Sequence, residues 1–238
     1  MPITSAEIKD RETVRVGLIG ELKRLKAANN AFRVIDIGGR HNPWADEVTD
    51  AYVDVFSFDT DKQLYVGDIN DDEVWRQVEA DGPYSFAIIS HVLEDIRYPM
   101  TALRRMPRIA HAGFLGLPDR HTEFSNGISK YWLGQSHHSW IFSVKRGEDA
   151  NYLQALPKFA CVEYFNHKRP APAESSEEYG PRTLLWLRPE LADREQEFAV
   201  RWKGDLPFKV PDYTLDLPTQ VAAYRDLLTD CVEDPDRA

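Results

Sequence analysis

The sequence predicts an α/β protein with a doubly wound, Rossmann-like sheet that is mostly parallel. Short β-branched, apolar segments alternate with amphipathic helical segments over residues 33–120. The run Phe86–Ile89 is apolar without a break, as expected for a central parallel strand that is covered on both faces. The chain has 238 residues, 42% of them hydrophobic, which is enough for one large domain with a buried core.

The first predicted elements are a helix and a strand that ends in two glycines. Apolar residues recur at helical spacing over Ser5–Asn30, with Ser5 as the expected N-cap. Arg33–Gly39 is short and β-branched, which predicts a buried strand that runs into a tight turn.

Strands and helices then alternate up to residue 118. Pro107 is expected to end or kink the helix Pro99–Ala110 early, because proline lacks the backbone N–H. The predicted strands are Ala51–Phe56, Gln63–Gly67, Tyr84–Ser90 and Gly113–Leu117, and the predicted helices are Asp71–Ala80 and Pro99–Ala110.

The pattern is less regular from residue 119 onward. Residues 119–155 are rich in aromatic residues and histidine, and a loop rich in proline and serine covers 169–181. We expect one domain over residues 1–190, with an insertion at about 120–147, and an extension over 191–238 packed on the same domain. The later predicted elements are the strands Phe159–Phe165, Thr183–Leu187 and Phe198–Trp202 and the helix Thr219–Cys231.

Composition argues against several classes of partner. The formal net charge is −10 and the pI is about 5.2, so a nucleic-acid partner is not expected. No apolar run approaches the roughly 20 residues of a membrane span, and the N-terminus lacks the pattern of a secretory signal. Cys161 and Cys231 form neither a zinc motif nor a disulfide framework, so we expect a cytoplasmic protein with two free thiols. The sequence leaves the oligomeric state open.

Acidic residues and glycines follow the predicted strands in order. Asp36-Ile37-Gly38-Gly39 ends the first strand, and open α/β sheets bind ligands at such carboxyl ends. Asp50 lies just before the second strand and Asp54 within it, where a carboxylate can accept hydrogen bonds from ribose hydroxyls. Asp68 follows the third strand, where it can meet an adenine amino group. The sequence therefore indicates a nucleotide-type site at this edge.

The same segments resemble the ordered motifs of class I S-adenosylmethionine (SAM)-dependent methyltransferases, of the methyltransferase type 11 kind. The similarity runs through VIDIGGRHNPW, VTDAYVDVF, YVGDIND, FAIISHVLEDIRYPMTALRRM and AGFLGLPDR, over about residues 33–120 and more loosely to about 190. The most specific piece is Ser90–Ile96. The resemblance implies a seven-stranded sheet with a reversed last strand pair, supplied by residues 159–165 and 183–187.

The resemblance also implies a role for each motif residue. SAM would be held by a loop of Asp36, Gly38 and Gly39, with Asp50 or Asp54 on its ribose. Its adenine would lie between Asp68 and Ile69, and its sulfonium near Ser90 and His91. Two positions depart from the family pattern: Arg40-His41 replaces the third glycine, and Asp95 replaces the last histidine of the family's "LEH".

Histidines after the fifth strand are candidates for the base of a methyl transfer to oxygen. The candidates are His121, His137 and His138, since histidine titrates near neutral pH. Adjacent residues of a strand point to opposite faces, so we expect only one of His137 and His138 to face the acceptor, and we favour His138. A metal site from His121, His137 or Asp119 is left open, but no ligand spacing calls for one, and none is expected.

These observations predict a SAM-dependent O-methyltransferase that acts on a small-molecule or glycan acceptor such as a sugar hydroxyl. The guess of a sugar rests on aromatic residues beside the histidines, among them Trp132, Trp140 and Phe142. The alternative is a catalytically inactive methyltransferase-like module for binding or assembly, motivated by the missing third glycine. A nicotinamide-dependent oxidoreductase is disfavoured, because the first strand is not followed by GxGxxG.

Overall fold

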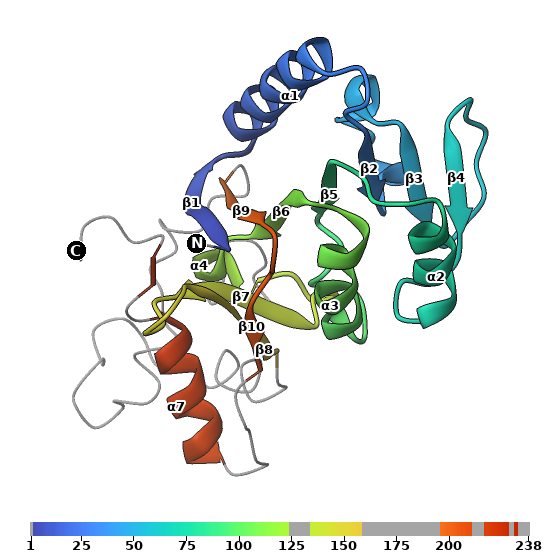
Figure 1. The fold of residues 1–238 in the computed structure, drawn as a ribbon. Helices are drawn as coiled ribbons and strands as arrows, with labels where there is room; N and C mark the ends of the chain where they lie inside the picture. Colours follow the sequence, from blue (N-terminus) through green and yellow to red (C-terminus); the bar gives the residue numbers. More distant parts are fainter. Residues whose placement is uncertain (1, 124–133, 159–195, 211–216, 229–230, 233–238) are drawn as a thin grey trace.

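The computed structural model describes residues 2–123, 134–158, 196–210, 217–228 and 231–232. These residues form a seven-stranded sheet, a separate three-stranded sheet and flanking helices (Figure 1). The larger sheet has the order β1-β9-β6-β5-β2-β3-β4. Its strands are β1 (Ile3–Asp10), β2 (Val34–Ile37), β3 (Ala51–Asp54), β4 (Gln63–Val66), β5 (Phe86–Ser90), β6 (Ala112–Pro118) and β9 (Gln196–Lys203).

The strand directions confirm the predicted doubly wound, mostly parallel sheet. Strands β2 to β6 are parallel to one another. Strand β9 is antiparallel to both of its neighbours, β6 and β1, so β1 runs in the same direction as the five. The predicted strands 159–165 and 183–187 lie outside the described residues. The two strands at this end of the sheet are β9 and β1.

The N-terminal prediction is wrong in part, because the chain begins with a strand and the helix starts later. Helix α1 covers Arg11–Ala28, and its N-cap is Asp10, whose side chain accepts a hydrogen bond from Thr13 N at 2.8 Å. Ser5 lies within β1, paired with Arg201 of β9. Pairing with a strand about 190 residues away overrides the helical spacing of the local sequence.

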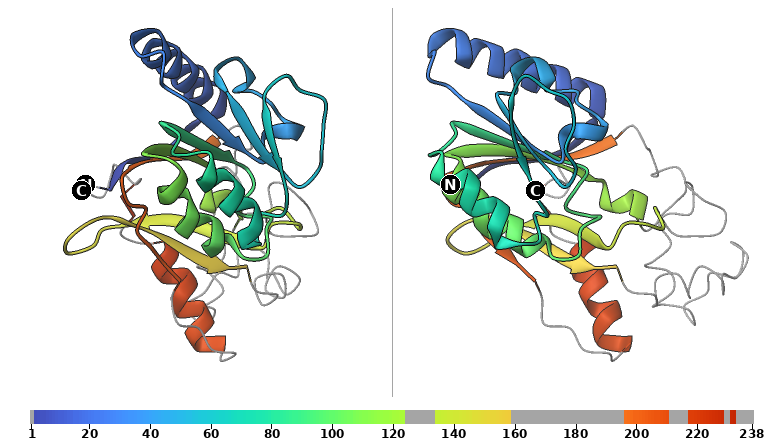
Figure 2. Two further views of the ribbon diagram at one scale, coloured as in Figure 1. Left: turned by 45° about the vertical axis from the view of Figure 1, so that its right-hand side comes forward. Right: turned by 90° about the vertical axis from the view of Figure 1, so that its right-hand side faces the viewer.

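Helices cover both faces of the large sheet (Figure 2). Leu18 and Leu22 of α1 pack on Val34, Phe86 and Ile88 on one face. The alternate residues of the same strands face α2 and α3 on the other, as the period of two requires. The helices and 3₁₀ turns are α1, η1 (Gly39–His41), η2 (Asp46–Val48), α2 (Asp72–Ala80), α3 (Pro99–Ile109), α4 (Arg120–Glu123) and α7 (Leu217–Leu228).

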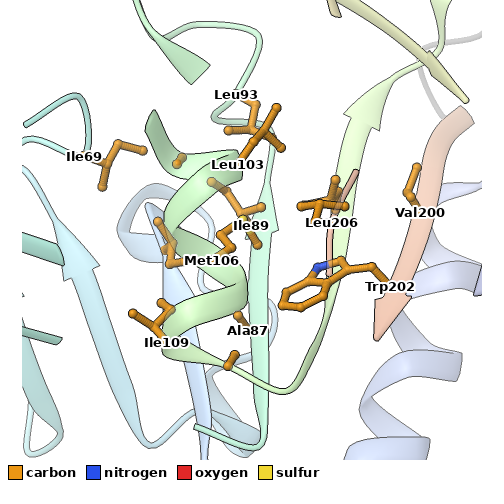
Figure 3. Packing of buried hydrophobic residues seen from close by; sticks show 14 of the residues in the cluster. Ile69, Ala87, Ile89, Leu93, Leu103, Met106, Ile109, Val200, Trp202 and Leu206 are labelled. Carbon is orange, nitrogen blue, oxygen red and sulfur yellow. The ribbon is translucent and has the colours of Figure 1, made fainter. Parts of the chain in front are cut away.

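Helix α3 carries the apolar stripe of the second face. Leu103, Met106 and Ile109 lie along one side of this helix, in one cluster with Ile89 of β5 and Trp202 of β9 (Figure 3). The expectation that Pro107 ends the helix early is wrong, since α3 continues to Ile109.

The smaller sheet has the order β10-β8-β7 and joins the same core cluster through Phe142 and Leu153. Helix α7 contacts β7 and β8, and Tyr224 donates a hydrogen bond to Pro157 O at 2.7 Å. The expected division near residue 190 lies outside the described residues. The strands are β7 (Trp140–Lys145), β8 (Tyr152–Pro157) and β10 (Phe208–Lys209).

Within the described part of the chain, no helix has both the length and the apolar character needed to cross a membrane.

Candidate functional site

A cavity of about 570 Å³ lies at the carboxyl ends of the parallel strands β2 to β5. This is where open α/β sheets bind ligands, because loops from neighbouring strands diverge there. Eight of the nine residues that the sequence predicts for the cofactor line it; the ninth, Asp50, does not. The eight are Asp36, Gly38, Gly39, Asp54, Asp68, Ile69, Ser90 and His91.

The two glycines after β2 are needed for different reasons. Gly38 has φ +76°, a left-handed conformation, and a Cβ there would lie 2.5 Å from Val92 Cγ2. Gly39 lies against the carboxylate of Asp36, and a Cβ there would lie 2.2 Å from Asp36 Oδ2. Glycine therefore lets the backbone pass between Val92 and Asp36 at the cavity wall.

The carboxyl group of Asp36 is buried beneath this turn. Burial, opposed by Arg15 and reinforced by Asp54, raises the pKa of Asp36 to about 7. Its Oδ2 has no hydrogen-bond partner among the described residues, although Asp36 lines the cavity. A ligand that offers a hydrogen-bond donor or a positive charge would satisfy it.

The structure separates the two acids proposed for the ribose. Asp54, at the end of β3, lines the cavity, and its Oδ1 accepts a hydrogen bond from Phe56 N at 3.1 Å. Asp50 is held outside the cavity lining by two partners. Lys26 Nζ lies 2.6 Å from its carboxylate, and Val34 N donates to it at 2.8 Å. Asp50 therefore ties α1 to the start of β2.

The loop after β4 supplies the wall formed by Asp68 and Ile69. The carboxylate of Asp68 accepts hydrogen bonds from Asn70 N at 2.8 Å and Asn70 Nδ2 at 2.7 Å, which hold the loop. Trp75 of α2 donates from Nε1 to Ile69 O at 2.9 Å. These hydrogen bonds, to the carboxylate of Asp68 and to the backbone oxygen of Ile69, therefore hold the loop in place.

Ser90 and His91 belong to a buried ionic cluster that the sequence did not reveal. Ser90 Oγ donates to Glu197 Oε1 at 3.2 Å, and Arg15 Nη2 lies 3.5 Å from the same oxygen. His91 lies between two fully buried carboxylates: its Nδ1 is 3.1 Å from Glu94 and its Nε2 is 3.2 Å from Glu197. Arg15 comes from α1 and Glu197 from β9, so only the folded sheet brings them here.

The cluster keeps His91 charged. Burial lowers the pKa of His91, but Glu197 and Glu94 more than offset it and raise the pKa to about 9. The backbone of His91 has φ +54°, which is uncommon for a residue other than glycine. This conformation turns the imidazolium between the carboxylates at the edge of the cavity.

The three candidate bases lie in two places. His121 Nδ1 is 2.9 Å from Asp119 Oδ1, beyond the end of β6. His138 Nδ1 is 2.7 Å from the buried Glu123, and its Nε2 is 3.9 Å from Asp95, which lines the cavity. His137 Nε2 is 4.0 Å from the same Asp95 oxygen.

The segment with His137 and His138 is a turn rather than a strand, so both rings can approach one side. Their centroids are 4.5 Å apart, at an interplanar angle of 76°. The two histidines therefore share Asp95 instead of pointing to opposite faces.

Two of the three aromatic residues that suggested a sugar are not available as a binding surface. Trp140 and Phe142 are buried in the core cluster, and Trp132 lies outside the described residues.

Arg40, which replaces the third glycine, has its guanidinium 5.6 Å from the ring centroid of Phe56 and is not among the cavity-lining residues. The departure from the family pattern therefore leaves the cavity open.

Comparisons with known proteins yield distant structural likenesses. No family model and no curated protein matches the chain. The N-terminal domain of EvdMO1 with SAH bound is similar at 10% identity and a TM-score of 0.37, over 78% of this chain and 80% of that one. A SAM-dependent methyltransferase from Archaeoglobus fulgidus is similar at 14% identity and a TM-score of 0.37, over 79% and 94%.

A third similar structure is the MycE methyltransferase of the mycinamycin biosynthetic pathway, in complex with Mg, SAH and mycinamycin VI. The likeness has 14% identity and a TM-score of 0.33, and it covers 81% of this chain and 50% of that one. The strand order and strand directions of this chain by themselves define a Rossmann-like sheet.

Proposed function

We propose that this protein is a SAM-dependent methyltransferase that transfers a methyl group to an oxygen of a small polar acceptor. The observation that carries the proposal is the convergence of eight predicted residues, from four strand ends, on one cavity. When bound, SAM supplies a methyl group activated on a cationic sulfonium, and its transfer to oxygen leaves a neutral thioether. The features of the cavity fit this group.

Each wall matches one part of the cofactor. The turn at Gly38 and Gly39 brings backbone close to the ligand, where a Cβ would collide with Val92 or Asp36. Asp54 would offer carboxylate oxygens to the ribose hydroxyls, and Asp68 and Ile69 would flank the adenine. Asp36 offers an unpaired buried oxygen, and Glu94 and Glu197 set the charge near the methionine end. Asp50 is left with a structural role.

The base that we assign to the acceptor side of the site is His138. In the tautomer with hydrogen on Nδ1, His138 donates a hydrogen bond to Glu123 Oε1 at 2.7 Å. In this tautomer Nε2 carries the lone pair, and this atom lies 3.9 Å from Asp95, which lines the cavity. In this arrangement, His138 takes the proton of an acceptor hydroxyl, with the cavity aligning the reactants. His121 and His137 are the secondary candidates.

Methyl transfer is tested by the mass of the product. The tag-free protein is incubated with SAM and a panel of small hydroxyl compounds, with sugars and glycans first. We expect one acceptor to gain the mass of one methyl group, and His138→Ala to lower turnover by roughly 10²-fold. Near-normal turnover of His138→Ala with intact cofactor binding would reject this base. A protein that binds SAM and methylates none of the panel would favour the inactive binding module.

A further inference from the structure

We infer that Asp95, His137 and His138 form a binding site for one divalent transition-metal ion, with Zn²⁺ as the best match. Nε2 of His137 and of His138 lie 4.0 and 3.9 Å from Asp95 Oδ1, and the three ligand atoms all lie within 4.8 Å of one another. Two imidazoles and one carboxylate are a donor set that suits zinc and similar ions better than magnesium or calcium.

Side-chain rotations are enough to bring the three ligand atoms to an ion. Zinc binds nitrogen and oxygen at about 2.0–2.2 Å, so tetrahedral ligand atoms lie roughly 3.3–3.6 Å apart. The separations from Asp95 therefore need to shorten by about half an ångström, and the separation between the two histidine ligand atoms, which is within 4.8 Å, by up to about 1.5 Å. The side chains of His137 and Asp95 are 63% and 42% exposed, so they are free to rotate inward.

A buried acid behind His138 prepares this ring as a ligand. Glu123 is 1% exposed and lies 2.7 Å from His138 Nδ1, while Lys158 Nζ lies 3.1 Å from its other oxygen. Metal-binding histidines usually donate their second N–H to such a carboxylate, which fixes the tautomer and makes the free nitrogen more basic. Because His138 is only 9% exposed, its ring is held in place before an ion arrives.

The position of the site indicates its use. Three protein ligands leave a fourth position open, as in catalytic rather than structural zinc sites. Asp95 also lines the cavity, so the ion would lie at its rim. An acceptor hydroxyl bound there would release its proton more readily, to solvent water at the rim of the cavity, and His138 would then act as a ligand instead of a base. This role rests on the proposed function, whereas the binding of the ion does not.

The site is tested by titrating the tag-free, metal-stripped full-length protein with Co²⁺ and following its visible absorption, then displacing it with Zn²⁺. We expect one ion per chain. Asp95→Asn and His137→Ala should each weaken binding at least tenfold, and Glu123→Gln by about 10- to 100-fold. His111→Ala, an exposed histidine outside the cluster, is the control and should bind as the original protein does. Thermal melts without metal show that each variant is folded.

Two results would overturn the metal site: no saturable Co²⁺ binding, or binding that Asp95→Asn and His137→Ala both leave unchanged. A parallel titration with S-adenosylhomocysteine (SAH) in the presence of a chelator keeps this test separate from the cofactor proposal. Cofactor binding without Co²⁺ binding would remove the metal site and leave the proposed function standing. Co²⁺ binding without cofactor binding would do the reverse.

Discussion

At the scale of single residues, two glycines show how similar backbones serve different purposes. Gly38 and Gly82 both have positive φ, +76° and +84°. Around Gly82 a Cβ would meet nothing within 4 Å, whereas at Gly38 it would strike Val92 in the cavity wall. Gly82 serves chain geometry only, whereas Gly38 also shapes the cavity.

We predict that Gly38→Ala and Gly82→Ala both lose stability, Gly38→Ala the more because of its contact with Val92, and that they differ in ligand binding. Each adds the strain of a left-handed non-glycine residue, about 1–2 kcal/mol, which chemical denaturation measures. Only Gly38→Ala displaces Val92, so it should weaken SAH binding at least about tenfold, or 1.4 kcal/mol, by calorimetry. Equal SAH affinity in the two variants would show that the turn does not contact the cofactor.

His91 yields a prediction about pH. Its pKa of about 9 in the folded protein is above the ordinary value of 6.5, so the folded state binds the proton more tightly. The stabilisation from His91 is therefore complete below about pH 6.5 and is lost as the pH rises toward 9. An NMR titration of the imidazole should give a pKa near 9, and unfolding free energy should fall over this window. A pKa at or below 6.5 would contradict the ionic cluster.

At the scale of elements, the sequence could predict those that depend on their own local pattern but not those that depend on long-range pairing. Strands β2 to β6 and helices α2 and α3 were predictable, because their apolar residues show the period of the element they form. Strand β1 was not, since its conformation depends on pairing with β9 near the other end of the chain. For the same reason Arg15 and Glu197 escaped notice: no motif links them to Ser90.

Helix α3 provides a test of the predicted apolar face. Leu103 is fully buried against the sheet, while its neighbour Arg104 is exposed. Leu103→Ala should lower the free energy of unfolding by about 2–5 kcal/mol, because it leaves a cavity. Arg104→Ala should change it by no more than about 0.5 kcal/mol, as is usual at the surface. Similar losses in both variants, measured by urea denaturation, would contradict this packing.

At the scale of the whole molecule, the sheet order explains why distant motifs meet. Strands β2, β3, β4 and β5 are neighbours and parallel, so their carboxyl ends present the motif residues to one cavity. The order of the motifs along the sequence could predict this convergence. It could not show that Asp50 lies outside the cavity lining, because this position depends on the ion pair with Lys26 of α1. Nor could it show that Asp95 lies beside His137 and His138, which a turn brings together.

The central claim is that this cavity binds SAM, and calorimetric titration with SAH tests it most directly. We predict one-to-one binding that Asp54→Asn weakens by about 10- to 100-fold, through loss of hydrogen bonds to a charged group. Asp50→Asn should bind SAH as the original protein does, because Asp50 pairs with Lys26 and Val34 instead of lining the cavity. The absence of measurable binding to both SAM and SAH by the folded protein would contradict the account.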